Sequence, residues 1–225
     1  MKSRFYGSAV RTLIFDFDGL IIDSESADFQ SWKGIFETEG CDLTLDFWNR
    51  GIGTNGPEYS PFAELERQLK RPLDREAVRN RQWREFDELC GGLPLLPGVL
   101  GCLEAARARG LNIGLASSAS YKERIIGHLE RTGIHGYFSA IRCCQVGGDL
   151  KPKPHPDVYL AVMADMGVKP EEAVAFEDSP NGIRAAKAAG LFCVAVPNKM
   201  TMDLPMTQAD MIIPSLEVAA LELSR

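Results

Sequence analysis

The sequence lacks the marks of several specialised classes of protein. Only three of its 225 residues are histidines, and none of its six cysteines belongs to a Cys-x-x-Cys pair. Neither a zinc site nor a disulfide-stabilised scaffold is therefore indicated, and we expect reduced, mostly buried thiols. No apolar run approaches the roughly 20 residues of a transmembrane helix. The run Thr12–Phe15 is also too short for a signal peptide, so we expect a cytoplasmic protein with no membrane partner.

An excess of positive charge is also missing. Lys and Arg number 25 against 31 Asp and Glu, for a formal net charge of −6. This balance argues against nucleic acid as a partner, although a local basic patch can still bind an anion. The sequence has no repeats and no low-complexity segment, and 45% of its residues are hydrophobic. We expect a globular protein of one large or two modest domains, as a monomer or a weak dimer.

Short apolar runs alternate with helical patterns over most of the chain. The runs that we predict as strands are Val10–Phe15, Leu111–Ala116, Phe138–Cys143, Val174–Phe176, Phe192–Val196 and Met211–Ile213. The patterns that we predict as helices are Tyr121–Thr132, Pro156–Met166, Ser179–Ala189 and Glu217–Leu223. Such alternation is typical of βαβ units with right-handed crossovers. The predicted fold class is therefore α/β, with a Rossmann-like, doubly wound parallel sheet.

The stretch 24–96 differs, because it has helical periodicity and no strand-like run. We predict an all-helical insert at residues 23–97, within an α/β core formed by residues 1–22 and 98–225. Asp74 is expected to cap one helix of the insert. An aromatic stripe is expected to form the core of the helical bundle: Trp32, Phe36, Trp83 and Phe86.

Polar residues follow three of the predicted strands at the point where each strand ends. These are Asp16-x-Asp18-Gly19, Ser117-Ser118 and Glu177-Asp178. Ligands bind at the carboxyl edge of open parallel sheets, so we expect these side chains to form one site.

The two aspartates after the first strand indicate a metal-assisted reaction. Carboxylates as close as Asp16 and Asp18 resist simultaneous ionisation unless a cation compensates. Mg²⁺ prefers such oxygen ligands, and Glu177 and Asp178 would complete its site. One aspartate can act as a nucleophile and the other as acid and base. The alternative for this pair is a solvated turn, because Asp-Gly is common in turns.

Three further side chains are candidates for binding an anion. Lys153 lies in a stretch that prolines stiffen, and a rigidly held lysine can neutralise phosphate; the alternative is a surface lysine in a loop. Ser117 and Ser118 can donate to phosphate oxygens near the start of the next helix, or one of them can cap that helix. Ser179 is expected only to cap a helix that begins at Pro180.

Four segments together resemble the motifs of the haloacid dehalogenase superfamily of phosphotransferases. In chain order they are Ile14–Glu25, Leu115–Ser120, Lys153–Tyr159 and Ala175–Gly190. The resemblance covers the whole predicted core. It also places a helical cap where the subgroup of beta-phosphoglucomutase and small sugar-phosphate phosphatases has one.

The resemblance implies a role for each matched residue in transferring a phosphoryl group from a small phosphorylated metabolite. Asp16 attacks phosphorus, and Asp18 protonates the leaving oxygen and then activates water. The residues implied to hold Mg²⁺ are Asp16, Asp18 through its backbone carbonyl, Glu177 and Asp178. Those implied to bind the phosphoryl group are Ser117, Ser118 and Lys153. Possible substrate contacts from the cap are Ser24, Glu25 and Asn55, with Arg50, Arg79 and Arg84 as weaker candidates.

The same resemblance leaves hydrolysis and isomerisation open. Mutase-like caps carry a His soon after the first motif and an Arg in the next cap loop, where this chain has Asp28 and Asn55. A mutase must hold a second phosphate, so the missing cations favour a phosphatase, although Arg50 could substitute. A non-catalytic phosphate-binding protein is a third possibility. Asp18 argues against carbon–halogen cleavage, because dehalogenases lack an acid at that position.

Overall fold

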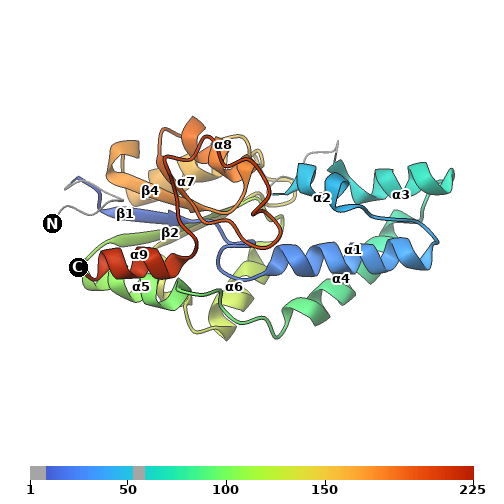
Figure 1. Cartoon of the computed structure of the whole chain (residues 1–225), viewed down its shortest axis with the longest axis horizontal. Coiled ribbons are helices and arrows are strands. Elements are labelled where there is room, and N and C mark those ends of the chain that lie inside the picture. The colour runs from blue at the N-terminus through green and yellow to red at the C-terminus, as the bar shows by residue number, and fades with distance from the viewer. Residues whose placement is uncertain (1–8, 53–58) are drawn as a thin grey trace.

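The computed structural model describes residues 9–52 and 59–225, where it has the predicted alternation of strands and helices (Figure 1). The strands are β1 (Thr12–Phe15), β2 (Asn112–Ser117), β3 (Ala140–Cys143), β4 (Ala173–Glu177), β5 (Phe192–Ala195) and β6 (Met211–Ile212). The α-helices of the insert are α1 (Ser24–Thr38), α2 (Leu45–Gly51), α3 (Pro61–Leu69) and α4 (Arg75–Cys90). Those of the core are α5 (Val99–Ala108), α6 (Lys122–Arg131), α7 (Asp157–Met166), α8 (Pro180–Ala188) and α9 (Leu216–Leu223).

The six strands form one parallel sheet in the order β3-β2-β1-β4-β5-β6. β1 pairs with β2 on one side and with β4 on the other, so that Phe15 lies opposite both Leu115 and Phe176. Every residue of β1 is buried, as expected of a central parallel strand with both faces covered. The predicted α/β class and doubly wound sheet are confirmed.

Two layers of helices cover the sheet, and the side chains of β1 alternate between them. Leu13 and Phe15 pack in one apolar cluster with residues of α5, α6 and α9. Ile14 packs in another with residues of α7 and α8. Figure 1 shows α5 and α9 on one side of the sheet and α7 and α8 on the other.

The insert extends away from the sheet (Figure 1). It has a hydrophobic core of its own. Trp32 and Phe36 belong to this core, as predicted, together with Trp48 and Leu65. Asp74 caps α4, because its side chain accepts a hydrogen bond from a backbone N–H in the first turn. Among the described residues the insert is all-helical, and we call it the cap. Its bounds, residues 23–97, stay a prediction.

The structure also shows the state of the thiols and the apolar character of the helices. All six cysteines are free thiols, and all are buried except Cys41, which is partly exposed. Within residues 9–52 and 59–225, none of the helices has the length and apolar character required to cross a membrane.

Candidate active site

The predicted polar residues meet at the carboxyl edge of the sheet. Asp16 directly follows β1, while Ser117 and Glu177 are the last residues of β2 and β4, which flank β1. Asp178 comes next after β4, and Lys153 reaches the same place from the segment before α7. Residues more than a hundred positions apart in the chain therefore share one site because parallel strands end together.

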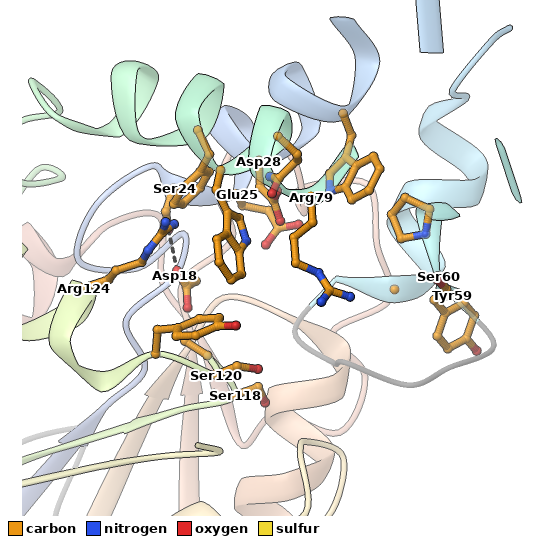
Figure 2. A pocket seen from close by; sticks show the side chains of 18 of the residues that line it. Asp18, Ser24, Glu25, Asp28, Tyr59, Ser60, Arg79, Ser118, Ser120 and Arg124 are labelled. Atoms are coloured by element: carbon orange, nitrogen blue, oxygen red, sulfur yellow. Dashed lines mark hydrogen bonds between the residues drawn. The ribbon is translucent and has the colours of Figure 1, made fainter. Parts of the chain in front are cut away.

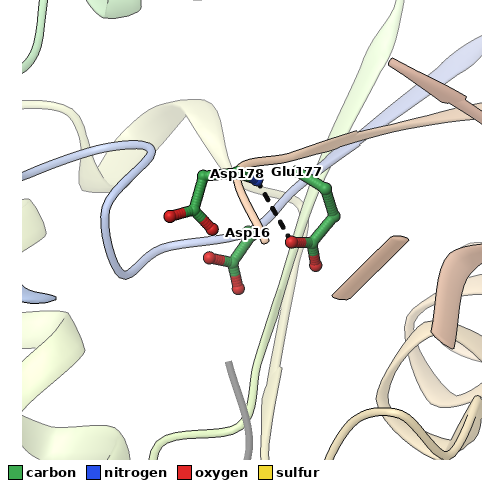
Figure 3. Close-up of side chains that lie close together, drawn as sticks. All are labelled: Asp16, Glu177 and Asp178. Carbon is green, nitrogen blue, oxygen red and sulfur yellow. Dashed lines mark hydrogen bonds between the residues drawn. The ribbon is translucent and has the colours of Figure 1, made fainter. Parts of the chain in front are cut away.

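Three buried carboxyl groups form the centre of this site (Figure 3). Asp16, Glu177 and Asp178 each contribute an oxygen, and these oxygens lie within 4.8 Å of one another. The Nζ atom of Lys153 donates to Oδ1 of Asp16, to Oε1 of Glu177 at 2.6 Å and to the carbonyl of Ala116 at 3.0 Å. Only 1% of the Lys153 surface is exposed, so the alternative of a surface lysine is wrong.

Burial and repulsion from neighbouring acids disfavour the charged forms of Asp16 and Asp178. Desolvation raises the pKa of Asp16 to about 8, against the attraction of Lys153 and with further repulsion from Glu177. Desolvation also raises the pKa of Asp178 well above its ordinary value, and the repulsion of Asp16 and Glu177 adds to this. Three acids thus share one lysine, and a further cation among them would favour ionisation. Their oxygen atoms suit a hard divalent cation such as Mg²⁺.

Two hydroxyl groups hold the side chain of Asp18. Ser24 donates to Oδ1 of Asp18 at 2.7 Å, and Ser117 donates to Oδ2 at 3.2 Å. Ser117 also accepts a hydrogen bond from the backbone N–H of Ala119 at 2.9 Å. The next helix begins only at Lys122, so the alternative that Ser117 or its neighbour caps that helix is wrong. The hydroxyl of Ser117 instead orients Asp18.

Ser118 connects β2 to the segment that carries the lysine. Its hydroxyl accepts a hydrogen bond from the backbone N–H of Lys153 at 3.1 Å. The prolines around Lys153 delay the helix as predicted, because α7 begins at Asp157 after Pro156. The lysine is therefore held through its backbone as well as through its ammonium group.

Hydrogen bonds to both carboxylate oxygens hold the side chain of Glu177 in place. Oε1 accepts from the hydroxyl of Tyr159 at 2.6 Å, and Oε2 accepts from the backbone N–H of Asp178 at 3.2 Å and from Ser179 at 3.4 Å. Ser179 also caps α8, as predicted, by accepting from the N–H of Gly182 at 3.1 Å. A side-chain carbon at Gly182 would collide with the Glu177 carboxylate. The carboxylate of Glu177 thus occupies the space that a side chain at position 182 would fill.

The sequence reading missed Asn198, which steadies Asp178. Its Nδ2 donates to Oδ2 of Asp178 at 2.7 Å and to the carbonyl of Gly19 at 2.9 Å. Its Oδ1 accepts from the backbone N–H groups of Met200 and Thr201 at 2.8 and 3.2 Å. Asn198 follows β5 by three residues, so the rule that found the other strand-end residues could also have found this one.

A cavity of about 660 Å³ lies between this edge and the cap. Asp18 and Ser118 line it from the core, and Ser24, Glu25 and Asp28 line it from α1 (Figure 2). On the core side the cavity is thus bordered by Asp18, the second of the two aspartates after β1. A bound molecule there would contact both the core and the cap.

Two carboxyl groups of α1 face this cavity. Oε1 of Glu25 accepts from the indole N–H of Trp48 at 2.8 Å, and Oδ1 of Asp28 accepts from the amide of Gln82 at 2.7 Å. Desolvation raises the pKa of Glu25 to about 8, and repulsion from Asp28 and Asp18 adds to it. Desolvation likewise raises the pKa of Asp28 to about 7, with added repulsion from Asp18.

Of the three cap arginines named as weaker substrate contacts, Arg79 alone lines the cavity. Arg79 lines the cavity, but it is exposed and lies over the ring of Phe62 at 5.4 Å. Arg84 and Arg50 do not line the cavity, and Arg50 bonds instead to its neighbours on α2. Asn55 lies outside the described residues.

The prediction that Trp83 and Phe86 belong to the core of the helical bundle is wrong. Both are only partly buried and line the cavity, facing α6. The guanidinium group of Arg124 lies 5.1 Å from the ring centre of Trp83 and 5.8 Å from that of Phe86. Tyr121 packs edge-on against Trp83 at 4.8 Å, and Arg124 pairs with Asp87 at 3.1 Å. The two aromatic residues therefore pack across the boundary between cap and core.

Comparisons with known proteins agree with this geometry. A model of the haloacid dehalogenase-like hydrolases matches residues 10–190. "Putative phosphatase YhcW" of Bacillus subtilis is 40% identical over 96% of this chain and 95% of its own. "Phosphorylated carbohydrates phosphatase" of Thermotoga maritima is 32% identical over 81% and 82%. A crystal structure of a "putative beta-phosphoglucomutase" from Thermotoga maritima superposes with a TM-score of 0.72 at 27% identity, covering 95% of this chain and 98% of the other.

Proposed function

Since the chain belongs to the haloacid dehalogenase-like hydrolases and is a phosphoric monoester hydrolase, we propose that it is a Mg²⁺-dependent phosphatase of small sugar phosphates. Asp16 is the nucleophile and Asp18 the general acid and base. The observation that carries this proposal is the placement of both aspartates at one strand end. Asp16 lies among buried charges, and Asp18 lies on the wall of the cavity.

In the first half of the reaction a carboxylate oxygen of Asp16 attacks phosphorus. The bond between phosphorus and the sugar oxygen breaks, and Asp18 gives its proton to that oxygen. The hydrogen bonds from Ser24 and Ser117 direct Asp18 toward this task. The products are a free sugar and an aspartyl-phosphate on Asp16.

In the second half Asp18 takes a proton from water. The water attacks phosphorus, the acyl-phosphate bond breaks, and phosphate leaves with Asp16 restored. Lys153 stays beside Asp16 throughout and favours its ionised form. Ser118 lines the cavity next to Asp18 and is suited to donate to a phosphoryl oxygen.

The buried acids fit Mg²⁺, which would neutralise charge on the phosphoryl oxygens when bound. Asp16 and Asp178 would hold the ion, with the backbone carbonyl of Asp18. Glu177 belongs to the same cluster, but donors already meet both of its oxygens. It therefore acts chiefly by holding Lys153 and by adding negative charge near the ion.

The cavity supports hydrolysis over isomerisation. Asp28, at the position where mutase-like caps have a histidine, is an acid held by Gln82. Arg50, the possible substitute for a cap cation, bonds to Asp46 and does not line the cavity. A second phosphate would therefore meet an acid where a mutase needs a positive charge.

Phosphate release from a panel of phosphorylated metabolites tests the proposal. The panel contains pentose and hexose phosphates, phosphoglycolate, glycerol phosphate, nucleotides and p-nitrophenyl phosphate. We expect release with Mg²⁺, loss of release in EDTA and in Asp16→Asn, and normal folding of that variant. Asp46→Asn, an exposed change on α2, is the control and should keep wild-type activity. Full turnover by Asp16→Asn would refute the mechanism, and conversion of beta-glucose 1-phosphate to glucose 6-phosphate without phosphate release would establish the mutase.

A further inference from the structure

The wall of the cavity formed by α1 is acidic. Glu25 and Asp28 are three residues apart on α1, so they share one face of the helix, and both point into the cavity (Figure 2). Each has one oxygen fixed by a neutral donor, the indole of Trp48 or the amide of Gln82. Gln82 is itself buried and also donates to Ser31 at 3.0 Å. The two carboxyl groups are thus held in place beside the space that a substrate would fill.

Cations of the protein offset the charge of this wall only in part. In the described part of the chain, neither Glu25 nor Asp28 belongs to an ion pair. Arg124 and Arg79 also line the cavity, the first paired with Asp87 and the second exposed and over the ring of Phe62. The pKa values of both acids are raised chiefly because burial penalises their charges, and at Asp28 the attraction of Arg124 offsets this only in part.

On the basis of the proposed phosphatase activity, we propose that Glu25 and Asp28 select the alcohol part of the substrate. They favour phosphate monoesters whose alcohol part carries hydroxyl or ammonium donors, and they reject esters that carry a second anionic group.

Hydrogen bonding and repulsion both lead to this selectivity. Above their pKa values of about 8 and 7, Glu25 and Asp28 are carboxylates, which accept hydrogen bonds and cannot donate. Sugar hydroxyls or an ammonium group would then satisfy their remaining lone pairs. A carboxylate or a second phosphate on the substrate would approach like charges in a partly desolvated cavity, where repulsion is stronger than in water. The two lining arginines offset this repulsion only in part, because Arg79 is exposed and screened by solvent and salt and Arg124 is paired with Asp87.

Two pairs of matched esters test the proposal. Sorbitol 6-phosphate and 6-phosphogluconate have the same open chain and differ in a terminal carboxylate. Glucose 6-phosphate and glucosamine 6-phosphate differ in one ammonium group. At pH 9, above the raised pKa values of both acids, we expect kcat/KM for sorbitol 6-phosphate to exceed that for 6-phosphogluconate by at least about tenfold. Where turnover of an ester is too slow to measure, the two esters are compared by their inhibition constants against p-nitrophenyl phosphate hydrolysis.

Variants assign the selectivity to the wall. The double variant Glu25→Gln, Asp28→Asn keeps the shape of the side chains and removes their charge, so it should lower the ratio of the first pair about tenfold. Glu37→Gln removes a charge from the same helix outside the cavity, where Glu37 is exposed beside Lys33. It should leave the ratio unchanged. A higher kcat/KM for glucosamine 6-phosphate than for glucose 6-phosphate would indicate that the wall prefers an ammonium donor. A higher kcat/KM for glucose 6-phosphate would indicate that it prefers hydroxyl donors.

The failures of the two proposals can be told apart. Equal or better use of 6-phosphogluconate by the wild type, with normal turnover of p-nitrophenyl phosphate, would overturn the selective wall and leave the phosphatase intact. An unchanged ratio in the double variant would also overturn it. Loss of all phosphate release with every ester, p-nitrophenyl phosphate included, would instead overturn the proposed function.

Discussion

Replacing Gly182 by alanine has two opposite effects on the free energy of unfolding. In the interior of a helix, alanine is favoured over glycine by about 1 kcal/mol. Gly182 is the third residue of α8, where its new side-chain carbon would collide with the carboxylate of Glu177. The matched control is Gly127→Ala in α6, where a side-chain carbon would meet nothing within 4 Å.

The structure indicates that the collision is the larger effect. Glu177 is fully buried and accepts hydrogen bonds from Lys153, Tyr159 and Ser179, so moving it disrupts at least one bond to a charged group. Each such bond contributes about 1.5–3 kcal/mol. Subtracting the gain from helix propensity, we expect the loss of one such bond in Gly182→Ala to lower the free energy of unfolding by roughly 0.5–2 kcal/mol. Gly127→Ala should raise it by about 0.5–1 kcal/mol.

Urea unfolding of the two variants and the wild type measures these changes, and phosphate release measures their effect on the site. We expect Gly182→Ala to lose both stability and activity, because Glu177 holds Lys153 beside Asp16. Gly127→Ala should keep full activity. A Gly182→Ala protein as stable and as active as the wild type would refute the close packing that we describe.

Three further predictions concern the charged groups. Lys153→Met leaves buried acids without their cation and should lower the free energy of unfolding by about 3–5 kcal/mol in urea melts; a loss below about 1 kcal/mol would contradict this. Asn198→Ala frees Asp178 and should weaken Mg²⁺ binding about tenfold or more by calorimetric titration; wild-type affinity would contradict it. Because burial raises the pKa of Glu25 from 4.5 to about 8, the folded protein holds a proton that the unfolded chain releases, so this residue's contribution to stability falls as pH rises between these values. Glu25→Gln should flatten that slope, and an identical slope in both proteins would contradict the raised pKa.

The strands and the centre of the site could be predicted because one physical cause governs both. Central parallel strands are buried on both faces, so β1 reads as a continuous apolar run, and the first polar residue after it, Asp16, marks the functional edge. The register of β1 with β2 and β4 then brings Ser117 and Glu177 to the same edge. No knowledge of side-chain packing was needed for that step.

The sequence reading failed where packing between distant segments decides the structure. α5 was not predicted. It begins after Gly98, which has a φ of 84° and abuts the backbone of Glu217 in α9, a contact between distant segments. The helical periodicity places Trp83 and Phe86 on one apolar face of a helix. It does not show whether that face packs against the other cap helices or against the core. The contact of Asp28 with Gln82 likewise spans 54 residues between two helices.

A trapped intermediate tests the central claim most directly. The Asp18→Asn variant lacks the acid and base but keeps Asp16, and p-nitrophenyl phosphate has a leaving group that needs no acid. After a rapid acid quench, we predict one phosphoryl group on the peptide that contains Asp16, with a matching burst of nitrophenolate. The added variant Asp16→Asn should abolish both. A burst without a phosphorylated peptide, or a phosphoryl group on another residue, would contradict the account.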